Sequence, residues 1–459
     1  MTTAFDSLGL RPELLFALAQ VAYVQMTPIQ AHALPPMLEG ADVTGQAKTG
    51  SGKTAAFGLA LLQTIDPTVA ATQALVLCPT RELSEQIATE LRRLAQKLAN
   101  TRISTVCGGR PYRDQRRALL AGCHVVVGTP GRLGKHLRKE TMDLGALRVL
   151  VLDEADRMLD MGFIEQVDEI VGHCPDDRQT LLLSATFPDA IDALSARIQR
   201  TPQRVTVGTH VAADQLRQQV YSCSHSEREQ LIVDLLGNIK PATALIFCET
   251  REDCRRLGQF LEGWGADALT LHGELEQRER DDVLLQFSNG SASVLVATNL
   301  AARGLDIPSL PLVIISELSP DVESHMHRIG RTGRADEEGL AVSIVAGTRE
   351  QRRLAEIEAH LGHPIEPGPD LDTVRRLDFL QPANRTLLIL AGRKDKLRKG
   401  DVLGALVKDG GIPPEAIGRI DLMPRVCAVA ITRDHAAAAA AHFEGGRIKN
   451  KRVRVRLLG

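Results

Sequence analysis

The chain has 459 residues, of which 44% are hydrophobic and 24% charged, and its formal net charge at pH 7 is −2. This length predicts two to four domains with ordinary buried cores. A membrane protein and a secreted precursor are both disfavoured, because no apolar run approaches the ~20 residues of a membrane span and the N-terminal segment lacks the basic start and apolar stretch of a signal peptide.

The first segment that suggests chemistry is AKTGSGKT, Ala47 to Thr54. Gly50 and Gly52 allow backbone N–H groups to turn toward a phosphate, and the apolar stretch that follows predicts a helix beginning near Lys53. The Lys53 ammonium suits the β- and γ-phosphates of a nucleotide, and the Thr54 hydroxyl suits Mg²⁺. Ala47 replaces the first glycine of the usual pattern. The alternative, a flexible Gly/Ser turn, does not explain the Lys-Thr pair at this offset.

A second segment, LRVLVLDEADRMLDMGF at residues 147–163, ends an apolar run in three carboxylates. Residues 149–152 predict a buried parallel strand, and carboxylates at the end of such a strand need a nearby cation. We expect Asp153 to hold Mg²⁺ and Glu154 to orient and deprotonate an attacking water. Asp156 could pair with a basic residue across a domain cleft. A solvated helix N-terminus is the alternative, and it is weak beside the loop.

A series of three segments in the chain recurs once. ALVLCPTRE begins at Ala74 and ALIFCETRE begins at Ala244, and two further strand-like segments recur in the same order, VVVGT with VLVAT and LVLDE with LVIISE. Helical stretches lie between them, and strands that alternate with helices form parallel sheets. We therefore expect two similar α/β domains joined near residues 206–216. Chance similarity between buried strands is the alternative.

The second of these domains has no phosphate loop before Ala244, so we do not expect it to bind its own nucleotide. It has instead HRIGRTGR, in which Arg328, Arg331 and Arg334 are spaced by three residues, as on one helical face or in a tight turn. Arginine side chains stabilise the charge on a phosphoryl group in transfer. The alternative is a basic surface patch.

A further boundary is expected in GHPIEPGPDLD, residues 362–372. Beyond it, the strand and helix patterns run β-α-β-β-α-β, ending in the alternating KRVRVRLLG, which predicts a small α+β domain. Residues 382–459 carry 16 Lys+Arg and 7 Asp+Glu, a net charge of +9, so the rest of the chain carries −11. This asymmetry suggests a nucleic-acid-binding appendix, although a merely solvated basic surface is also possible. Phe443 is its one aromatic residue, so base stacking on the sheet is not expected.

Taken together, these motifs resemble those of the DEAD-box RNA helicases, from about Phe5 to Gly362. The matching segments, in order, are Phe5 with MTPIQ ending at Gln30, AKTGSGKT, PTREL, GG at Gly108 and Gly109, TPGR, DEAD, SAT, RGLD and HRIGRTGR. The basic tail resembles the RNA-binding domain of the DbpA subfamily. The resemblance implies two tandem RecA-like domains at 1–208 and 209–365, a linker at 366–381 and an RRM-like domain at 382–459.

The resemblance also implies roles for single residues. Phe5 and Gln30 would recognise adenine, Ala47 to Thr54 (with Lys48, Thr49 and Ser51) would hold the phosphates, and Asp306 would contact the ribose. Lys53, Asp153, Glu154, Arg331 and Arg334 would be catalytic, and Thr54 and Asp153 would hold Mg²⁺, the latter possibly through water. Asp156, Ser184, Thr186 and His327 would couple nucleotide state to domain closure. The RNA strand would lie on Arg81, Gly109, Thr129, Arg132, Gly273 and Thr298.

The implied activity is RNA-stimulated ATP hydrolysis with local opening of short duplexes, directed by the tail to a hairpin of 23S ribosomal RNA during assembly of the large subunit. A non-unwinding RNA clamp and a DNA-directed motor are the alternatives. The chain departs from the family at Asn299, where an aspartate is usual, which bears on how ATP and RNA binding are coupled. We expect a monomer in a bacterial cytoplasm, with the eight scattered cysteines as free, buried thiols.

Overall fold

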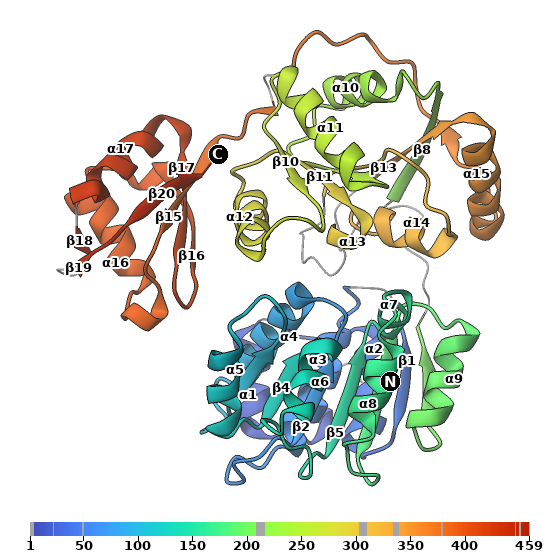
Figure 1. The fold of residues 1–459 in the computed structure, drawn as a ribbon, viewed down its shortest axis with the longest axis vertical. Coiled ribbons are helices and arrows are strands. Elements are labelled where there is room, and N and C mark those ends of the chain that lie inside the picture. Colours follow the sequence, from blue (N-terminus) through green and yellow to red (C-terminus); the bar gives the residue numbers. More distant parts are fainter. Residues whose placement is uncertain are drawn as a thin grey trace. The chain divides into compact units, whose positions relative to one another are not determined.

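The computed structural model describes residues 4–458 except 22, 48–49, 208–215, 303–309, 334–338, 378–379, 446 and 449–450. These residues separate into two compact units, one before and one after residues 208–215. The first unit is one α/β domain, and the second contains another α/β domain followed by the small C-terminal domain (Figure 1).

The first domain is built on a parallel sheet of seven described strands in the order β3-β4-β2-β5-β6-β1-β7. Its central strands are nearly all apolar and fully buried, as expected where helices cover both faces of a sheet. The strands are β1 (Val43–Gln46), β2 (Ala74–Leu77), β3 (Ile103–Val106), β4 (Val125–Gly128), β5 (Val149–Asp153), β6 (Gln179–Ser184) and β7 (Gln203–Thr206).

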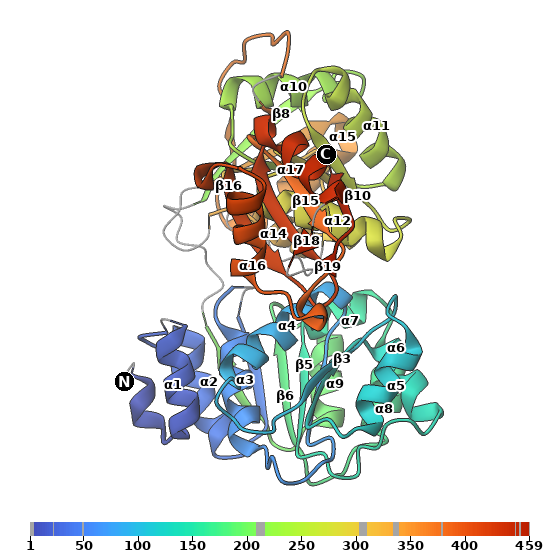
Figure 2. The same ribbon diagram turned by 90° about the vertical axis from the view of Figure 1, so that its left-hand side faces the viewer.

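Successive residues of each strand point to opposite faces of the sheet and enter two separate cores. Val76 and Val151 pack with α1 to α4, whereas Leu77 and Leu152 pack with the later helices (Figure 2). The helical elements are η1 (Phe5–Leu8), α1 (Pro12–Gln20), α2 (Pro28–Leu38), α3 (Lys53–Thr64), α4 (Arg81–Leu94), α5 (Tyr112–Leu120), α6 (Pro130–Arg138), α7 (Ala155–Asp160), α8 (Ile164–Val171) and α9 (Asp189–Ile198).

The second sheet repeats the order of the first, position by position, as β10-β11-β9-β12-β13-β8-β14. The prediction of two similar α/β domains is therefore confirmed. Its strands are β8 (Leu216–Cys223), β9 (Ala244–Cys248), β10 (Ala268–Leu271), β11 (Val294–Thr298), β12 (Leu312–Ile315), β13 (Gly339–Ala346) and β14 (Glu366–Pro367). The helices are α10 (Arg228–Ile239), α11 (Arg251–Gly263), α12 (Gln277–Ser288), α13 (Asn299–Ala302), α14 (Val322–Ile329) and α15 (Gly347–Leu361).

The stretch 366–381 is a linker according to the resemblance, and its described residues pack on the second domain. Its first two residues form β14, which pairs with β8. Farther along, Leu377 and Leu380 are buried in the core of the second domain. The Pro, Gly and Asp content that suggested a domain boundary thus marks an irregular extension of that domain, anchored by a few apolar side chains.

The C-terminal domain has a four-stranded antiparallel sheet in the order β16-β17-β15-β20 and a core formed with α16 and α17. Its elements are β15 (Asn384–Ile389), η3 (Arg393–Asp395), α16 (Lys399–Gly404), η4 (Ala405–Asp409), η5 (Pro414–Ala416), β16 (Ile417–Leu422), β17 (Cys427–Thr432), α17 (Arg433–Gly445), β18 (Arg447–Ile448), β19 (Lys451–Arg452) and β20 (Val455–Leu458). The order β-α-β-β-α-β is confirmed, but the predicted last strand is divided. Its first residues pair with β18 as a short hairpin, and β20 alone joins the main sheet.

All eight cysteines are free thiols, and seven of them are buried, as the sequence predicted. Among the helices that the structure describes, none is both long enough and apolar enough to span a membrane.

Candidate functional site

The phosphate loop and the carboxylates meet because three neighbouring strands end at the same edge of the first sheet. β6 lies between β5 and β1, with Gln46 beside Ser184 and Asp153 beside Leu183. The loop leaves β1, the DEAD segment leaves β5, and the SAT segment leaves β6. Parallel strands place all three carboxyl ends together, which is the usual site of ligand binding in such sheets.

The loop has the backbone geometry that its glycines predicted. Gly50 and Gly52 have φ of +83° and +95°, and α3 begins directly afterwards at Lys53. Gln30 donates its amide hydrogen to the Gly52 carbonyl at 3.1 Å and accepts one from the Thr27 backbone at 2.9 Å. A Cβ at Gly52 would lie 2.6 Å from Gln30 Nε2, so a larger residue would separate the two. The predicted adenine-recognition residue is thus bonded to the predicted phosphate loop.

The carboxylates are buried beside the Lys53 side chain, which donates to the Ala47 carbonyl. Burial raises the pKa of the Asp153 carboxyl from 3.8 to about 7, with the Lys53 ammonium opposing this shift and Glu154 adding to it. Glu154 adopts φ +52°, a left-handed conformation that costs a non-glycine residue about 1–2 kcal/mol. This strained backbone turns the chain sharply between β5 and α7.

Glu154 also faces a residue that the sequence did not single out. Arg157 is 2% exposed, and its Nη1 lies 3.4 Å from Glu154 Oε2. That oxygen is buried and accepts no hydrogen bond from the described residues. The i, i+3 spacing of Glu154 and Arg157 was the signal available in the sequence.

The carboxylate Asp156 joins the DEAD segment to the SAT segment. Its Oδ2 accepts hydrogen bonds from the Thr186 hydroxyl at 3.0 Å, the Thr186 backbone at 3.1 Å and the Ala185 backbone at 3.2 Å. In return the Asp156 backbone N–H donates to the Ser184 hydroxyl at 3.2 Å. A movement of either segment is therefore transmitted to the other.

The oxygen donors of this site suit a Mg²⁺ ion that takes only some of its ligands from the protein. No group of three or more His, Cys, Asp or Glu in the described part of the chain could enclose a metal. Asp153 and the Thr54 hydroxyl supply hard oxygen donors, and burial, the main cause of the raised pKa of Asp153, disfavours a charge there that no cation balances. Mg²⁺ commonly takes one or two protein oxygens and completes its shell with phosphate and water.

Several predicted residues lie elsewhere or outside the described residues. Phe5 is buried at 4% exposure in the core of the first domain, on η1. Lys48, Thr49, Asp306 and Arg334 fall outside the described residues. In the second domain His327 lies near the end of α14, and Arg331 follows that helix and is 3% exposed. The alternative of a basic surface patch is therefore wrong for Arg328 and Arg331, which are both buried.

The predicted RNA contacts of the first domain gather at the edge formed by β3, β4 and β2. Arg81 begins α4 after β2, and its guanidinium packs on Gly108, 3.2 Å from where a Cβ would lie. Gly109 has φ +70° after β3, and Thr129 follows β4 as the residue before α6. Arg132 donates to the Arg110 carbonyl at 3.1 Å and to Gln115 at 3.2 Å, so the buried Gln115 supports this edge without having been predicted.

The second domain presents the corresponding edge. Gly273 follows β10 and Thr298 ends β11, at the same places in the sheet as Gly109 and Thr129. Arg251 begins α11 as Arg81 begins α4, and its exposed side chain pairs with Glu274. The repeated TRE of PTRE and ETRE was the signal that would have predicted Arg251 as a further member.

Comparison with known proteins covers all three domains. Residues 27–194 match the family model of DEAD/DEAH box helicases, 227–336 that of the helicase conserved C-terminal domain, and 386–457 that of the DbpA RNA-binding domain. The ATP-dependent RNA helicase DbpA of Escherichia coli is 49% identical over 99% of this chain and 100% of its own length, and that of Bacillus subtilis is 34% identical over 98% of each. Saccharomyces cerevisiae Dbp5 bound to RNA and ADP BeF3 is 30% identical, with a TM-score of 0.73 over 80% of this chain and 95% of that one.

Proposed function

The chain belongs to the DEAD-box ATP-dependent RNA helicases of the DbpA subfamily, and from this premise we propose which of its residues hydrolyse ATP and which RNA it acts on. The observation that carries the proposal is the convergence of Lys53, Asp153 and Glu154 at the ends of neighbouring strands. The family binds RNA and uses ATP, so the proposal concerns the chemical role of each of these side chains.

In the hydrolytic step, Glu154 Oε2 accepts the proton of the attacking water. The water oxygen bonds to the γ-phosphorus while the bond from phosphorus to the β–γ bridging oxygen breaks, and ADP and phosphate leave. Lys53 and the N–H groups of Gly50 to Thr54 stabilise the phosphate charge. Mg²⁺, held by Thr54 and Asp153, would neutralise the developing negative charge when bound. Phe5 and Gln30 recognise adenine, and Asp306 the ribose.

Arg331 and Arg334 complete the site from the second domain. Arginine suits this role because its planar guanidinium binds phosphate oxygens through two parallel hydrogen bonds. We assign Asp156, Ser184, Thr186 and His327 to coupling between nucleotide state and domain closure. The Asp156–Thr186 hydrogen bond supports that assignment, because it ties the segment that holds the catalytic carboxylates to a neighbouring loop.

RNA lies across the carboxyl edges of both sheets, on Arg81, Gly109, Thr129 and Arg132 in one domain and on Gly273, Thr298 and Arg251 in the other. Glycine lets the RNA backbone approach closely, and arginine neutralises phosphate. Such contacts go to phosphate and sugar, so they hold a strand without reading its sequence.

The C-terminal domain supplies the targeting. In it, Leu387, Ile389, Val429 and Ile431 face the core, and the alternating Thr386, Leu388, Ala428 and Ala430 lie on the opposite face of the sheet. These four residues are buried too, and Thr386 accepts a hydrogen bond from Asn289 of the second α/β domain, so this face offers neither an exposed surface nor an aromatic ring for stacking. The basic residues are instead exposed beside the sheet, at Arg393, Lys394, Lys396, Arg398 and Lys399 and near the C-terminal end at Arg452 and Arg454. Arg456 is also exposed, but it pairs with Asp282 of the second α/β domain. We propose that these residues capture a structured RNA hairpin through its backbone and shape.

The hairpin is one of 23S ribosomal RNA, and the enzyme opens short duplexes beside it during assembly of the large ribosomal subunit, as a monomer in a bacterial cytoplasm. The test is the steady-state rate of ATP hydrolysis with ribosomal RNA, with unrelated RNA of equal length and with no RNA, at one salt concentration. We expect the highest rate with ribosomal RNA. Equal rates with both RNAs would remove the targeting part of the proposal and leave the helicase assignment.

A further inference from the structure

The second sheet contains a counterpart of the nucleotide site. β8 holds the place of β1, and β12 holds the place of β5. Ala74 lies beside Val149 in the first sheet as Ala244 lies beside Leu312 in the second. Counting along the strands from these pairs, Glu317 corresponds to Glu154. Likewise α10 after β8 corresponds to α3 after β1, and its first residue, Arg228, corresponds to Lys53.

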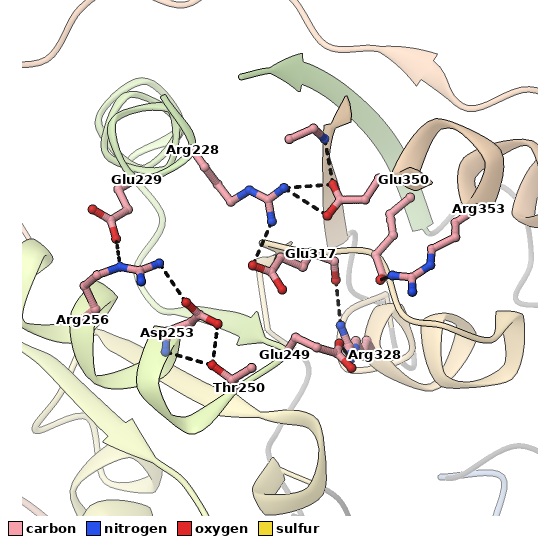
Figure 3. A network of polar contacts seen from close by, with 12 residues as sticks. Arg228, Glu229, Glu249, Thr250, Asp253, Arg256, Glu317, Arg328, Glu350 and Arg353 are labelled. Atoms are coloured by element: carbon pink, nitrogen blue, oxygen red, sulfur yellow. Dashed lines mark hydrogen bonds and ion pairs between the residues drawn. The ribbon is translucent and has the colours of Figure 1, made fainter. Parts of the chain in front are cut away.

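In this counterpart site, carboxylates of the protein itself bind the arginine. Arg228 is 6% exposed, and its Nη2 donates to the two Glu350 oxygens at 2.9 and 3.0 Å. Its Nη1 lies 3.1 Å from Glu317 Oε1 (Figure 3). Glu350 also accepts a hydrogen bond from the Ala346 backbone at 2.7 Å. Arg228, which corresponds to Lys53, is thus neutralised by carboxylates of its own domain. Lys53, by contrast, is proposed to bind phosphate.

The cavity beside Arg228 does not suit a phosphate ligand. It has a volume of about 310 Å³, and its lining includes three carboxylates that would repel an anion. Two of them, Glu229 and Asp253, pair with the exposed Arg256 at 2.7 and 2.8 Å. The third, Glu317, has its pKa raised by burial, an effect that the neighbouring Arg228 opposes. The ion pair of Arg228 with Glu317 therefore has a structural role within the domain and does not form part of a phosphate site.

Glu317 connects this ion pair to the arginine segment. Its backbone carbonyl accepts a hydrogen bond from Arg328 Nη1 at 2.9 Å, and Arg328 Nη2 bonds Glu249 at 3.0 Å (Figure 3). Arg328 is 1% exposed, and its carbonyl accepts the Arg331 backbone N–H at 3.2 Å. A series of contacts thus runs from the partly exposed Glu317 through the buried Arg328 to the buried Arg331.

We propose that Arg228 is a positioning residue for hydrolysis: by holding Glu317, it fixes Arg328 and, through Arg328, the turn that presents Arg331. This inference rests on the proposed role of Arg331 at the phosphates. The physical reason is that removing Arg228 leaves the buried Glu350 and the partly exposed Glu317 without their charge partner, which favours a shift of the segment after β12. A shift of about 1 Å in a group that acts on the transition state costs up to about 100-fold in rate.

The test uses the full-length protein with saturating RNA and compares Arg228→Met and Arg228→Lys with the wild type. We expect kcat for ATP hydrolysis to fall about 10- to 100-fold in Arg228→Met and less in Arg228→Lys, which keeps a charge but loses the two-pronged contact. The KM for ATP and the affinity for a fluorescent ADP should change less than about twofold, because the ADP-contacting loop lies in the first domain. Arg256→Met is the matched control from the same cavity, and it should retain the wild-type kcat.

A second measurement separates positioning from general damage. In an Arg331→Ala background, adding Arg228→Met should cost no further kcat, because the group that Arg228 positions is already missing. Multiplicative losses in the double variant would overturn the inference, as would an unchanged kcat in Arg228→Met. If Arg228→Met does not fold, Glu317→Gln must show the same pattern. An inactive wild type would refute the proposed function instead, so the two failures are distinguishable.

Discussion

Thr186 donates its hydroxyl hydrogen to Asp156 Oδ2 at 3.0 Å and its backbone N–H to the same oxygen at 3.1 Å. The two residues are 30 positions apart, on segments that leave neighbouring strands. Asp156 lies two residues after Glu154, the proposed base, and its backbone N–H also donates to the Ser184 hydroxyl, so both its side chain and its backbone connect this segment to the SAT segment.

This bond predicts the behaviour of Thr186→Val, which keeps the shape and loses the hydroxyl. A hydrogen bond to a charged group contributes about 1.5–3 kcal/mol, so we expect about tenfold fewer duplexes opened per ATP hydrolysed, with hydrolysis itself reduced much less. The measurement is strand displacement and phosphate release in the same sample. Thr68→Val, which removes a threonine–Asp66 bond far along the chain, is the control. Equal losses of both activities would contradict the coupling role.

The second prediction concerns the assigned base. Glu154→Gln should bind ATP and Mg²⁺ but hydrolyse about 10²- to 10⁴-fold more slowly, because only proton acceptance is lost. Lys53→Ala should instead weaken ATP binding, since it removes a charge that contacts the phosphates in the ground state. Nucleotide titration together with single-turnover hydrolysis distinguishes the two variants. Wild-type hydrolysis in Glu154→Gln would refute its assignment as the base.

These residues could be predicted from sequence because their signal is local. The spacing of Gly50, Gly52 and Lys53 specifies a loop and a helix start, and an apolar run ending in Asp153 specifies a strand end. The bond from Gln30 to the loop and the burial of Arg157 could not be read in this way, because each depends on packing between segments that are separate in the sequence. The ion pair of Arg228 with Glu317 also joins segments that are separate in the sequence. The correspondence of these two residues to Lys53 and Glu154 becomes visible when the two sheets are compared strand by strand.

The errors have physical causes of the same kind. Alternation in KRVRVRLLG predicted one strand, and the side chains do alternate, with arginines exposed and Val455 and Leu457 against the core. The backbone nevertheless divides between two partners, since hydrogen bonding depends on which strands lie nearby. The boundary expected at residues 362–372 rested on Pro, Gly and Asp content, which does not reveal that Leu377 and Leu380, farther along, pack in the core of the second domain.

The third prediction tests the division of the site between domains. A fragment of residues 1–208 contains both cores of the first sheet and the phosphate loop, so we expect it to fold and bind nucleotide. It lacks Arg331 and Arg334, and loss of such arginines costs about 10³-fold or more, so RNA should not stimulate its hydrolysis measurably. Phosphate release with and without RNA is the measurement. Robust RNA-stimulated hydrolysis by the fragment would show that the first domain is sufficient.

The fourth prediction concerns pH and His136, which is fully buried, bonded to Thr141 at 2.8 Å and stacked on Tyr112 at 4.3 Å between ring centres. Burial, aided by Arg132 and Lys135, lowers its pKa from 6.5 to about 4. As pH falls through 6.5 the unfolded state therefore takes up a proton before the folded state does, and stability is lost. From pH 7 to pH 5 this amounts to about 2 kcal/mol.

Urea unfolding of fragment 1–208, followed by circular dichroism, measures this loss. We expect His136→Gln to show a smaller decrease in unfolding free energy between pH 7 and pH 5 than the wild type does. The exposed His173 supplies the control, because His173→Gln should leave the decrease unchanged. The same pH dependence in wild type and His136→Gln would show that this ring is not the group responsible.

The last prediction concerns the basic C-terminal domain. In the proposed function, the α/β domains hold RNA by contacts that carry no sequence information, so specificity is assigned to another part of the chain. Charge alone would give tight, salt-sensitive and indiscriminate binding. Capture of one hairpin instead raises the local concentration of the neighbouring duplex into the ~mM range for a short connection. We therefore expect deletion of residues 382–459 to leave weak hydrolysis with any RNA and to abolish the preference for ribosomal RNA.

The complementary experiment transfers residues 382–459 to an unrelated protein, which should then bind the ribosomal hairpin. Reversing the exposed charges with Arg393→Glu and Lys394→Glu should weaken that binding and reduce its dependence on salt, because each phosphate contact contributes roughly one unit to the slope of log affinity against log salt concentration. The charge reversals are also made in the full-length enzyme, where the matched control is Arg352→Glu, an exposed position on α15 outside this domain. If the truncated enzyme still prefers ribosomal RNA to a control of equal length at the same salt, the α/β domains themselves must read the RNA.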